Sequence, residues 1–163
     1  MLWHPVYVGI GSNLDEPARQ VRRAFDALAA LPATGLWRRS SLYGSRPMGP
    51  VAQPDFVNAV AGLLTQLAPE DFLAELQRLE SGFGRVREQR WGPRRIDLDL
   101  LVFSRRQIDT GTLVIPHPGI VQRNFVLYPL AEVAPTLEVP GVGCVSVLAA
   151  RICGADIWRL ATN

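Results

Sequence analysis

Two aspartates in a short alternating segment are the sharpest chemical feature of the sequence. The segment Ile96-Asp97-Leu98-Asp99-Leu100 alternates apolar and acidic side chains. Because successive side chains of a β-strand point to opposite faces, Asp97 and Asp99 would share one face, about 6.6 Å apart along the strand. Two ionised carboxylates at that distance repel by roughly 2.5 kcal/mol at an effective dielectric of about 20, so a positive group should lie between them. Such oxygen ligands suit Mg²⁺, which also takes phosphate oxygens and water. The alternative is a solvated sheet face.

An arginine-rich run comes directly before these aspartates. Residues 78–95 hold six arginines against two glutamates, a local surplus of four positive charges. Guanidinium groups bind phosphate oxygens in pairs, so this run suits a highly anionic ligand, although each arginine taken alone could equally be a solvated surface charge. The arginines nearest the aspartates are Arg85, Arg87, Arg90 and Arg94. Carboxylates for a metal ion beside arginines for phosphates predict a metal–nucleotide site.

A histidine between two prolines is a further candidate. Pro116 and Pro118 restrict the backbone on both sides of His117 and so help to fix the direction of the imidazole. The ring could donate a hydrogen bond to a phosphate or a leaving group near neutral pH, or it could be an ordinary surface histidine.

Other binding patterns are incomplete. Gly9-Ile10-Gly11-Ser12-Asn13 follows an expected strand, but Leu14 stands where the dinucleotide-binding fingerprint needs glycine, which excludes a Rossmann site. RNA binding would require stacked aromatic side chains on the central strands. Residues 56–62 contain one aromatic residue, Phe56, so no nucleic-acid partner is expected. All 17 basic residues are arginine, and the absence of lysine excludes a P-loop and Schiff-base catalysis.

The composition is that of a single globular domain. The chain has 163 residues, of which 48% are hydrophobic and 20% charged, so we expect one domain over residues 1–163. A net charge of +2 is too small for a general nucleic-acid-binding surface. No apolar stretch approaches the length of a membrane span, and the first residues lack the pattern of a signal peptide. We therefore expect a cytoplasmic protein without a membrane partner.

The elements that must position these residues alternate in type. A strand is expected over residues 6–10, a helix from Pro17 up to Pro32, strands over 35–43 and 56–66, a second helix from Pro69 to Gly82, and a strand from Ile96 to Phe103. This order predicts an α+β fold with a ferredoxin-like βαββαβ core, in which an antiparallel sheet carries both helices on one face. The last 60 residues are expected as a C-terminal extension of short elements around the sheet. The long connection between the strands at 35–43 and 56–66 is a candidate functional loop.

Motifs spread over most of the chain follow a recognisable order. They are Tyr7-Val8-Gly9-Ile10-Gly11-Ser12-Asn13-Leu14, Gln53-Pro54-Asp55-Phe56-Val57-Asn58, Gly84-Arg85-Val86-Arg87, Arg90-Trp91-Gly92-Pro93-Arg94, Ile96-Asp97-Leu98-Asp99, Pro116-His117, Arg123-Asn124-Phe125 and Leu130-Ala131-Glu132-Val133-Ala134-Pro135. Over roughly residues 6–137 the sequence therefore resembles the 6-hydroxymethyl-7,8-dihydropterin pyrophosphokinase family of folate biosynthesis.

The resemblance implies a reaction and its nucleotide site. The family transfers the pyrophosphoryl group of ATP to the hydroxymethyl group of the pterin and releases AMP. By resemblance, Asp97 and Asp99 bind two Mg²⁺ ions that bridge the ATP phosphates and the attacking oxygen. The other residues with implied roles in phosphate stabilisation or nucleotide binding are Arg85, Arg94, Arg87, His117, Arg123, Gln77 and Glu80. Arg90 and Trp91 are implied in a loop that closes over both substrates and excludes water.

The resemblance also implies a pterin subsite. Phe56 and Phe125 would lie on the two faces of the flat pterin, and Asn58 would pair with its edge. Ser45 and Met48 would belong to a loop whose backbone reads the rest of that edge. Without the resemblance, Phe56, Phe125 and Asn58 would be interpreted as core or strand residues. The implied partners are small molecules, ATP and the pterin, and we expect a monomer.

A non-catalytic protein that binds a pterin or a nucleotide on the same fold is the alternative. Asp97 and Asp99 argue against it, because binding a neutral pterin requires no pair of metal-binding carboxylates. Formation of AMP would distinguish the two hypotheses.

Overall fold

The computed structural model describes residues 2–84 and 95–161. The first part of the chain forms β1 (His4–Ser12), α1 (Pro17–Ala29), β2 (Thr34–Arg39), β3 (Tyr43–Ser45), β4 (Phe56–Thr65), α2 (Pro69–Gly82) and β5 (Asp97–Phe103). The remainder forms β6 (Ile108–Asp109), β7 (Val114–Ile115), the 3₁₀ turn η1 (Ile120–Gln122), α3 (Asn124–Val133), β8 (Glu138–Val139), β9 (Gly143–Cys144), α4 (Val145–Arg151) and β10 (Ile157–Arg159).

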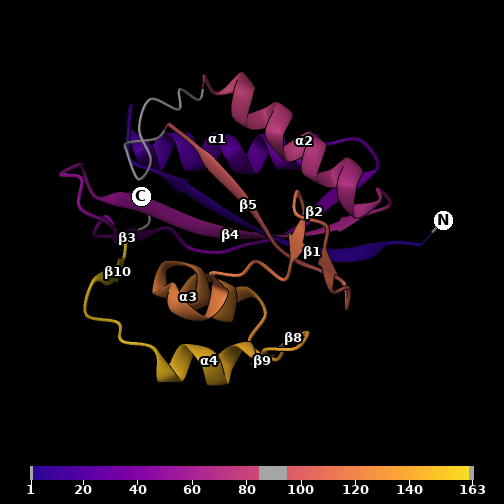
Figure 1. The fold of residues 1–163 in the computed structure, drawn as a ribbon. Coiled ribbons are helices and arrows are strands. Elements are labelled where there is room, and N and C mark those ends of the chain that lie inside the picture. Colours follow the sequence, from indigo (N-terminus) through magenta and orange to yellow (C-terminus); the bar gives the residue numbers. More distant parts are fainter. Residues whose placement is uncertain (1, 85–94, 162–163) are drawn as a thin grey trace.

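An antiparallel sheet separates two layers of helices. Among the described residues, six strands pair in the order β10-β3-β4-β1-β5, with β2 also paired to β4. Helices α1 and α2 cover one face of the sheet, and α3 and α4 lie on the opposite side (Figure 1). Because β1 is central, between β4 and β5, the core has the ferredoxin-like arrangement, and the predicted fold class is confirmed.

The strand expected over residues 35–43 is two strands, β2 and β3, which both pair with β4. Strand β2 ends before Ser40, whose hydroxyl accepts a hydrogen bond from the Val60 N–H (2.8 Å), while the Ser40 N–H donates to the Val60 carbonyl (2.9 Å). The pairing of β2 with β4 also shifts register between Leu36 and Arg38, as at a β-bulge. The Ser40 hydroxyl therefore takes the place of a backbone carbonyl as the acceptor for Val60. Beyond this point β4 pairs with β3.

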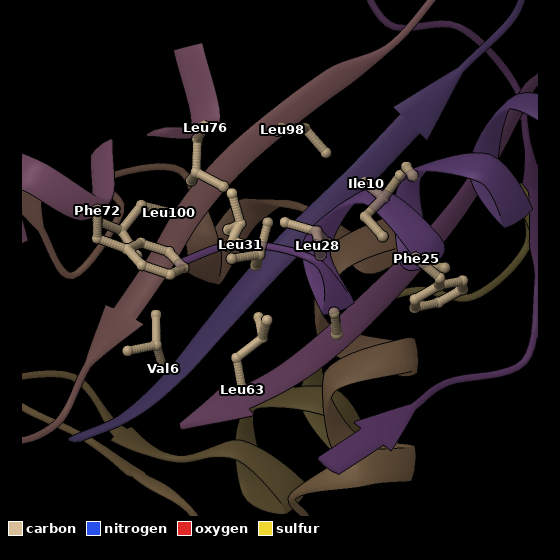
Figure 2. Packing of buried hydrophobic residues seen from close by; sticks show 14 of the residues in the cluster. Val6, Ile10, Phe25, Leu28, Leu31, Leu63, Phe72, Leu76, Leu98 and Leu100 are labelled. Carbon is tan, nitrogen blue, oxygen red and sulfur yellow. The ribbon is translucent and has the colours of Figure 1, made fainter. Parts of the chain in front are cut away.

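Alternation along β1 assigns the two faces of the sheet to different cores. Val6, Val8 and Ile10 are buried against α1 and α2, in the cluster that Figure 2 shows with Leu28 and Phe72. The intervening residues of β1 face α3, and among the residues of that second cluster are Tyr7, Val60, Leu101, Ile120, Val126 and Leu130. The β1 glycines that follow Tyr7 also face α3, on the side where the site forms.

The last 60 residues form short elements around the sheet, as predicted. Beyond that expectation, β10 pairs with β3 and so extends the sheet, with Trp158 opposite Gly44. In the part of the chain that the structure describes, no helix has the length and apolar character needed to cross a bilayer.

Replacement of Phe72 by alanine is expected to destabilise the fold. The ring is fully buried and lies edge to face against Phe103, with centroids 6.4 Å apart. Its removal leaves a cavity, so the free energy of unfolding should fall by about 3–5 kcal/mol. The control is Val147→Ala on α4, where the side chain is 44% exposed and the change should stay within about 0.5 kcal/mol. Urea denaturation measures both, and equal effects would contradict the assignment of Phe72 to the core.

Candidate active site

The two aspartates of β5 share one face of the sheet, as their alternation predicts. Asp97 and Asp99 are half-buried, whereas Leu98 and Leu100 are buried in the cluster below α1 and α2. The carboxylates are therefore on the side of the sheet that faces α3.

Glycines of β1 leave room beside these carboxylates. Gly11 pairs with Asp97 and Gly9 with Asp99. On its other side Gly11 pairs with Asn58 of β4, and a Cβ at residue 11 would already lie 3.4 Å from the Asn58 Oδ1. A larger side chain would press against Asn58, so glycine keeps the space between β5 and β4 open.

A cavity of about 470 Å³ occupies this region, within the usual range for small-molecule sites. Its lining comes from distant segments: Asp97 and Asp99 of β5, His117 and Arg123 from the segments before α3, and Gln77 and Glu80 of α2. The lining also includes the five residues predicted for a pterin, namely Ser45, Met48, Phe56, Asn58 and Phe125. All predicted site residues within the described ranges therefore border one cavity.

Arg123 supplies a positive charge beside one of the two aspartates, Asp99. Its Nη1 lies 3.7 Å from the Asp99 Oδ2, and its guanidinium lies over the Phe125 ring, 5.7 Å from the centroid. A Cβ at Gly119 would lie 2.8 Å from the Arg123 Nε, so this placement of the arginine needs a glycine there. Arg123 thus connects the carboxylates with the aromatic part of the cavity.

His117 has a defined tautomer. Its backbone N–H donates to the Leu101 carbonyl (2.9 Å), and its Nδ1 accepts a hydrogen bond from the Gly119 N–H (3.0 Å). The proton of the neutral ring is therefore on Nε2, which can donate. Burial, followed by the nearby Arg123, lowers the pKa of His117 below 6.5, against the opposite effect of Asp97. The imidazole is accordingly neutral at pH 7.

Glu80, predicted at the nucleotide site, also supports the strand that carries the aspartates. Its side chain is buried, and its Oε1 accepts a hydrogen bond from the Leu98 N–H (2.8 Å). That amide lies between Asp97 and Asp99 in the sequence, on the strand at the edge of the sheet. Helix α2 therefore holds β5 in place through this carboxylate.

The residues predicted for a pterin include a buried polar pair. The Asn58 Nδ2 donates to the Ser45 Oγ at 2.7 Å, and both side chains are buried. Phe56 and Phe125 are half-buried, and Met48 is exposed, beside the same cavity. An amide and partly exposed rings that border one cavity can recognise a flat heterocycle that carries both donors and acceptors.

Sequence reasoning missed the role of Ser12 and Asn13, which are buried immediately after the β1 glycines. The Asn13 Nδ2 donates to the Gln53 Oε1 (2.8 Å) and to the Pro54 carbonyl (3.0 Å), so it holds the loop that leads to Phe56. The Ser12 Oγ donates to the Arg95 carbonyl at 2.5 Å, just before Asp97. Two polar residues at the end of an apolar strand are the signal that could have indicated such anchors.

Five predicted residues lie in the segment 85–94, outside the described residues: Arg85, Arg87, Arg90, Trp91 and Arg94. Within the described ranges, no group of three or more His, Cys, Asp or Glu side chains has the arrangement of a metal centre built by protein alone. The candidate site thus offers two carboxylates on one strand, and any metal ion there needs further ligands from a substrate or water.

Comparisons with known proteins agree on one family. A sequence model described as 7,8-dihydro-6-hydroxymethylpterin-pyrophosphokinase (HPPK) matches residues 7–135. A 2-amino-4-hydroxy-6-hydroxymethyldihydropteridine pyrophosphokinase from Pseudomonas aeruginosa is 53% identical over 135 residues, which cover 83% of each chain. A protein of the same name from Haemophilus influenzae is 44% identical over 154 residues, covering 94% of this chain and 96% of the other.

The fold is similar to that of larger solved proteins. The crystal structure of Plasmodium falciparum HPPK-DHPS with pterin and p-hydroxybenzoate matches 92% of this chain with a TM-score of 0.70 at 14% identity. An HPPK-DHPS structure in complex with substrates matches the same share with a TM-score of 0.73 at 12% identity. This chain spans 43% of each of those chains.

Proposed function

This chain belongs to the 7,8-dihydro-6-hydroxymethylpterin-pyrophosphokinase family, and we propose that the cavity between β5, β4 and α3 is where it carries out the reaction of that family. The protein is a pyrophosphokinase of folate biosynthesis, with ATP as co-substrate: it transfers pyrophosphate from ATP to the hydroxymethyl group of 6-hydroxymethyl-7,8-dihydropterin and releases AMP. The observation that carries the site proposal is that Asp97 and Asp99 border the same cavity as Asn58, Phe56 and Phe125.

The carboxylate pair fits two magnesium ions that also bind the triphosphate. Mg²⁺ usually takes only one or two protein carboxylates and completes its coordination with phosphates and water. Asp97 and Asp99 are two such ligands on one face of β5, at a cavity wide enough for a nucleotide phosphate. Magnesium bound there would supply charge neutralisation at the transferring phosphates.

The residues of the chain orient the phosphates and stabilise their charge. Arg123 lies beside Asp99, and its guanidinium can bind phosphate oxygens as a planar pair of donors. The Nε2–H of His117 can donate a hydrogen bond to a phosphate oxygen without adding a second charge. Gln77 and Glu80 border the nucleotide part of the cavity. From the resemblance to the family, we assign phosphate contacts to Arg85, Arg87 and Arg94 and closure over the substrates to Arg90 and Trp91.

The pterin occupies the aromatic part of the cavity in this proposal. Phe56 and Phe125 contact the faces of its ring, and the Asn58 amide pairs with its edge. Ser45 accepts a hydrogen bond from Asn58 and so fixes which side of the amide is presented. Ser45 and Met48 border the same cavity, and the backbone of their loop reads the rest of the pterin edge.

An assay of the products tests the reaction. Protein mixed with Mg-ATP and 6-hydroxymethyl-7,8-dihydropterin should yield AMP and the pterin diphosphate in equal amounts. The appearance of ADP would contradict pyrophosphoryl transfer, and the absence of any product would favour the alternative of a non-catalytic binding protein. Omission of Mg²⁺ should abolish turnover, and its restoration should recover it.

Titration of His117 is expected below the usual range. Since its pKa in the folded protein is lower than 6.5, the unfolded chain binds more protons between the two values, and stability should fall as the pH decreases through that window. NMR titration of the ring protons should give a midpoint below 6.5. His117→Gln should remove this part of the acid destabilisation, whereas a midpoint at or above 6.5 would contradict the buried, neutral imidazole.

We also propose that the protein is a monomeric single domain over residues 1–163 that acts in the cytoplasm on small molecules, with no nucleic-acid or membrane partner. The net charge of +2 supports the absence of a nucleic-acid partner. Both core clusters pack on one continuous sheet, which supports a single domain. Light scattering coupled to size exclusion should give the mass of one chain, and twice that mass would contradict the monomer.

A further inference from the structure

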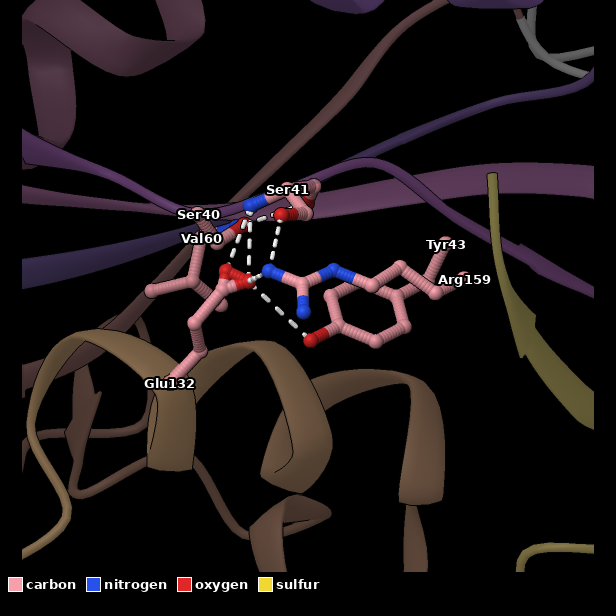
Figure 3. A network of polar contacts seen from close by, with 6 residues as sticks. All are labelled: Ser40, Ser41, Tyr43, Val60, Glu132 and Arg159. Carbon is pink, nitrogen blue, oxygen red and sulfur yellow. Dashed lines mark hydrogen bonds and ion pairs between the residues drawn. The ribbon is translucent and has the colours of Figure 1, made fainter. Parts of the chain in front are cut away.

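A carboxylate that the proposed reaction does not use connects α3 with two strands. Both Glu132 side-chain oxygens accept hydrogen bonds from the Ser41 N–H, at 2.9 and 2.7 Å. One of them also accepts from the Tyr43 hydroxyl (3.1 Å) and from the Arg159 Nη2 (2.8 Å). The same Nη2 donates to the Ser41 hydroxyl. Figure 3 shows Ser41, Tyr43 and Arg159 around the carboxylate of Glu132, which reaches them from α3.

The charge of Glu132 makes these bonds stronger than neutral ones. Its side chain is 23% exposed, so solvent competes with them only in part. Burial, and then the adjacent carboxylate, raise the pKa of Tyr43 to about 12. The phenol therefore keeps its proton at neutral pH and remains a donor to Glu132.

Of the connected elements, α3 and β3 each carry residues that line the cavity. Helix α3 begins next to Arg123 and carries Phe125. Strand β3 carries Ser45, which accepts the hydrogen bond of Asn58. Asn58 lies on β4, which pairs with β3, so the position of β3 relative to α3 sets where Ser45, the acceptor of the Asn58 amide, lies relative to the Phe125 ring.

The C-terminal strand completes this connection. Strand β10 pairs with β3, and the Trp158 side chain lies so close to Gly44 that a Cβ there would be 2.3 Å from the indole Nε1. Arg159, next to Trp158, reaches Glu132 from the outer edge of the sheet. The final segment of the chain thus holds β3 from the side opposite to β4.

We propose that Glu132 is a positioning residue for the pterin, because it fixes β3 and α3, and with them Asn58 and Phe125, at the spacing that the flat substrate needs. This inference rests on the proposed function, in which Phe125 and Asn58 contact the pterin. The proposed nucleotide ligands Asp97, Asp99 and His117 lie outside α3 and β3. Arg123 directly precedes α3 but is also paired with Asp99 of β5. Glu132 touches none of these four side chains among its hydrogen bonds and ion pairs in the described residues. A residue that only stabilised the fold would affect both substrates alike.

The test compares the two substrates in Glu132→Gln. The dissociation constant of a non-hydrolysable Mg-ATP analogue is measured first. The dissociation constant of the pterin is then measured from pterin fluorescence, with the analogue at saturating concentration. The pterin constant should increase by about tenfold or more, because bonds to a charged acceptor are lost, while the nucleotide constant changes by less than about twofold. Tyrosinate absorbance should show a lower pKa for Tyr43, assigned by its disappearance in Tyr43→Phe.

Matched controls separate positioning from general stability. Asp26 of α1, on the other face of the sheet, forms an exposed ion pair with Arg39 of β2. Asp26→Asn removes this pair and should change neither the pterin nor the nucleotide dissociation constant. Arg159→Gln keeps Glu132 but removes its cation, and it should weaken pterin binding selectively by a smaller factor. This variant is also the test if Glu132→Gln does not fold.

Two results would overturn the inference: equal weakening of both ligands, or unchanged pterin binding in Glu132→Gln and Arg159→Gln. These measurements need no turnover. A wild-type protein that binds the pterin but forms no AMP would contradict the proposed reaction. The ratio of the pterin dissociation constants of variant and wild type would still decide the role of Glu132.

Discussion

Asp97→Asn and Asp99→Asn are each expected to lower kcat by at least about 10³-fold. Each change replaces a carboxylate, proposed as a Mg²⁺ ligand, by a neutral amide of nearly the same size. The fold should persist because both side chains are half-buried at the rim of the cavity, outside the core cluster. AMP formation at saturating Mg-ATP and pterin measures the effect.

The control for these variants is Asp109→Asn, an exposed carboxylate on the short β6 strand away from the cavity. It should retain wild-type kcat. Thermal unfolding should show that all three variants are folded, and titration with Mg²⁺ should show weaker binding only for the two β5 variants. Activity near the wild-type value in Asp97→Asn or Asp99→Asn would remove that residue from the metal site.

Phe125→Ala should have the second largest effect, on the pterin. Loss of a partly buried ring removes apolar contact and stacking worth about 2–3 kcal/mol, so the dissociation constant of the pterin should increase by about 30- to 150-fold. Fluorescence of the bound pterin measures it.

The change at Phe125 should affect the nucleotide less. Arg123 lies over the same ring, so a change of a few-fold in the Mg-ATP constant is expected when the ring is lost. Phe125→Tyr retains the ring and should bind both substrates nearly as well as the wild type. Equal losses for the two substrates in Phe125→Ala would mean that the ring supports Arg123 and does not contact the pterin.

Much of the fold could be predicted because its signals are local. The apolar residues of α1, from Val21 to Leu28, recur with the period of a helix, and Pro17 begins the helix where the sequence indicates. The same reasoning joined β2 and β3 into one strand, because the interruption after Arg39 involves a hydrogen bond between Ser40 and Val60, 20 residues away.

The contacts that complete the site were beyond such reasoning. Asn13 bonds to Gln53, 40 residues later, and Ser41 bonds to Arg159, 118 residues later. Nothing near Glu132 in the sequence indicates that its carboxylate accepts bonds from β3 and β10. Partners at these separations are chosen by the order of the strands and the placement of α3, which are properties of the whole fold.

The sequence by itself determined that Asp97 and Asp99 lie on one face of a strand, because the side-chain period of a strand is a property of the backbone alone. The sequence also determined the family, because its ordered motifs match those of the family and imply one reaction. Only the tertiary structure decided that these carboxylates share a cavity with Asn58 and Phe125, since the pairing of β5 with β1 and of β1 with β4 sets which side chains are neighbours. The glycines at positions 9 and 11 keep that cavity open because they place no side chain on the face of β1 that borders it.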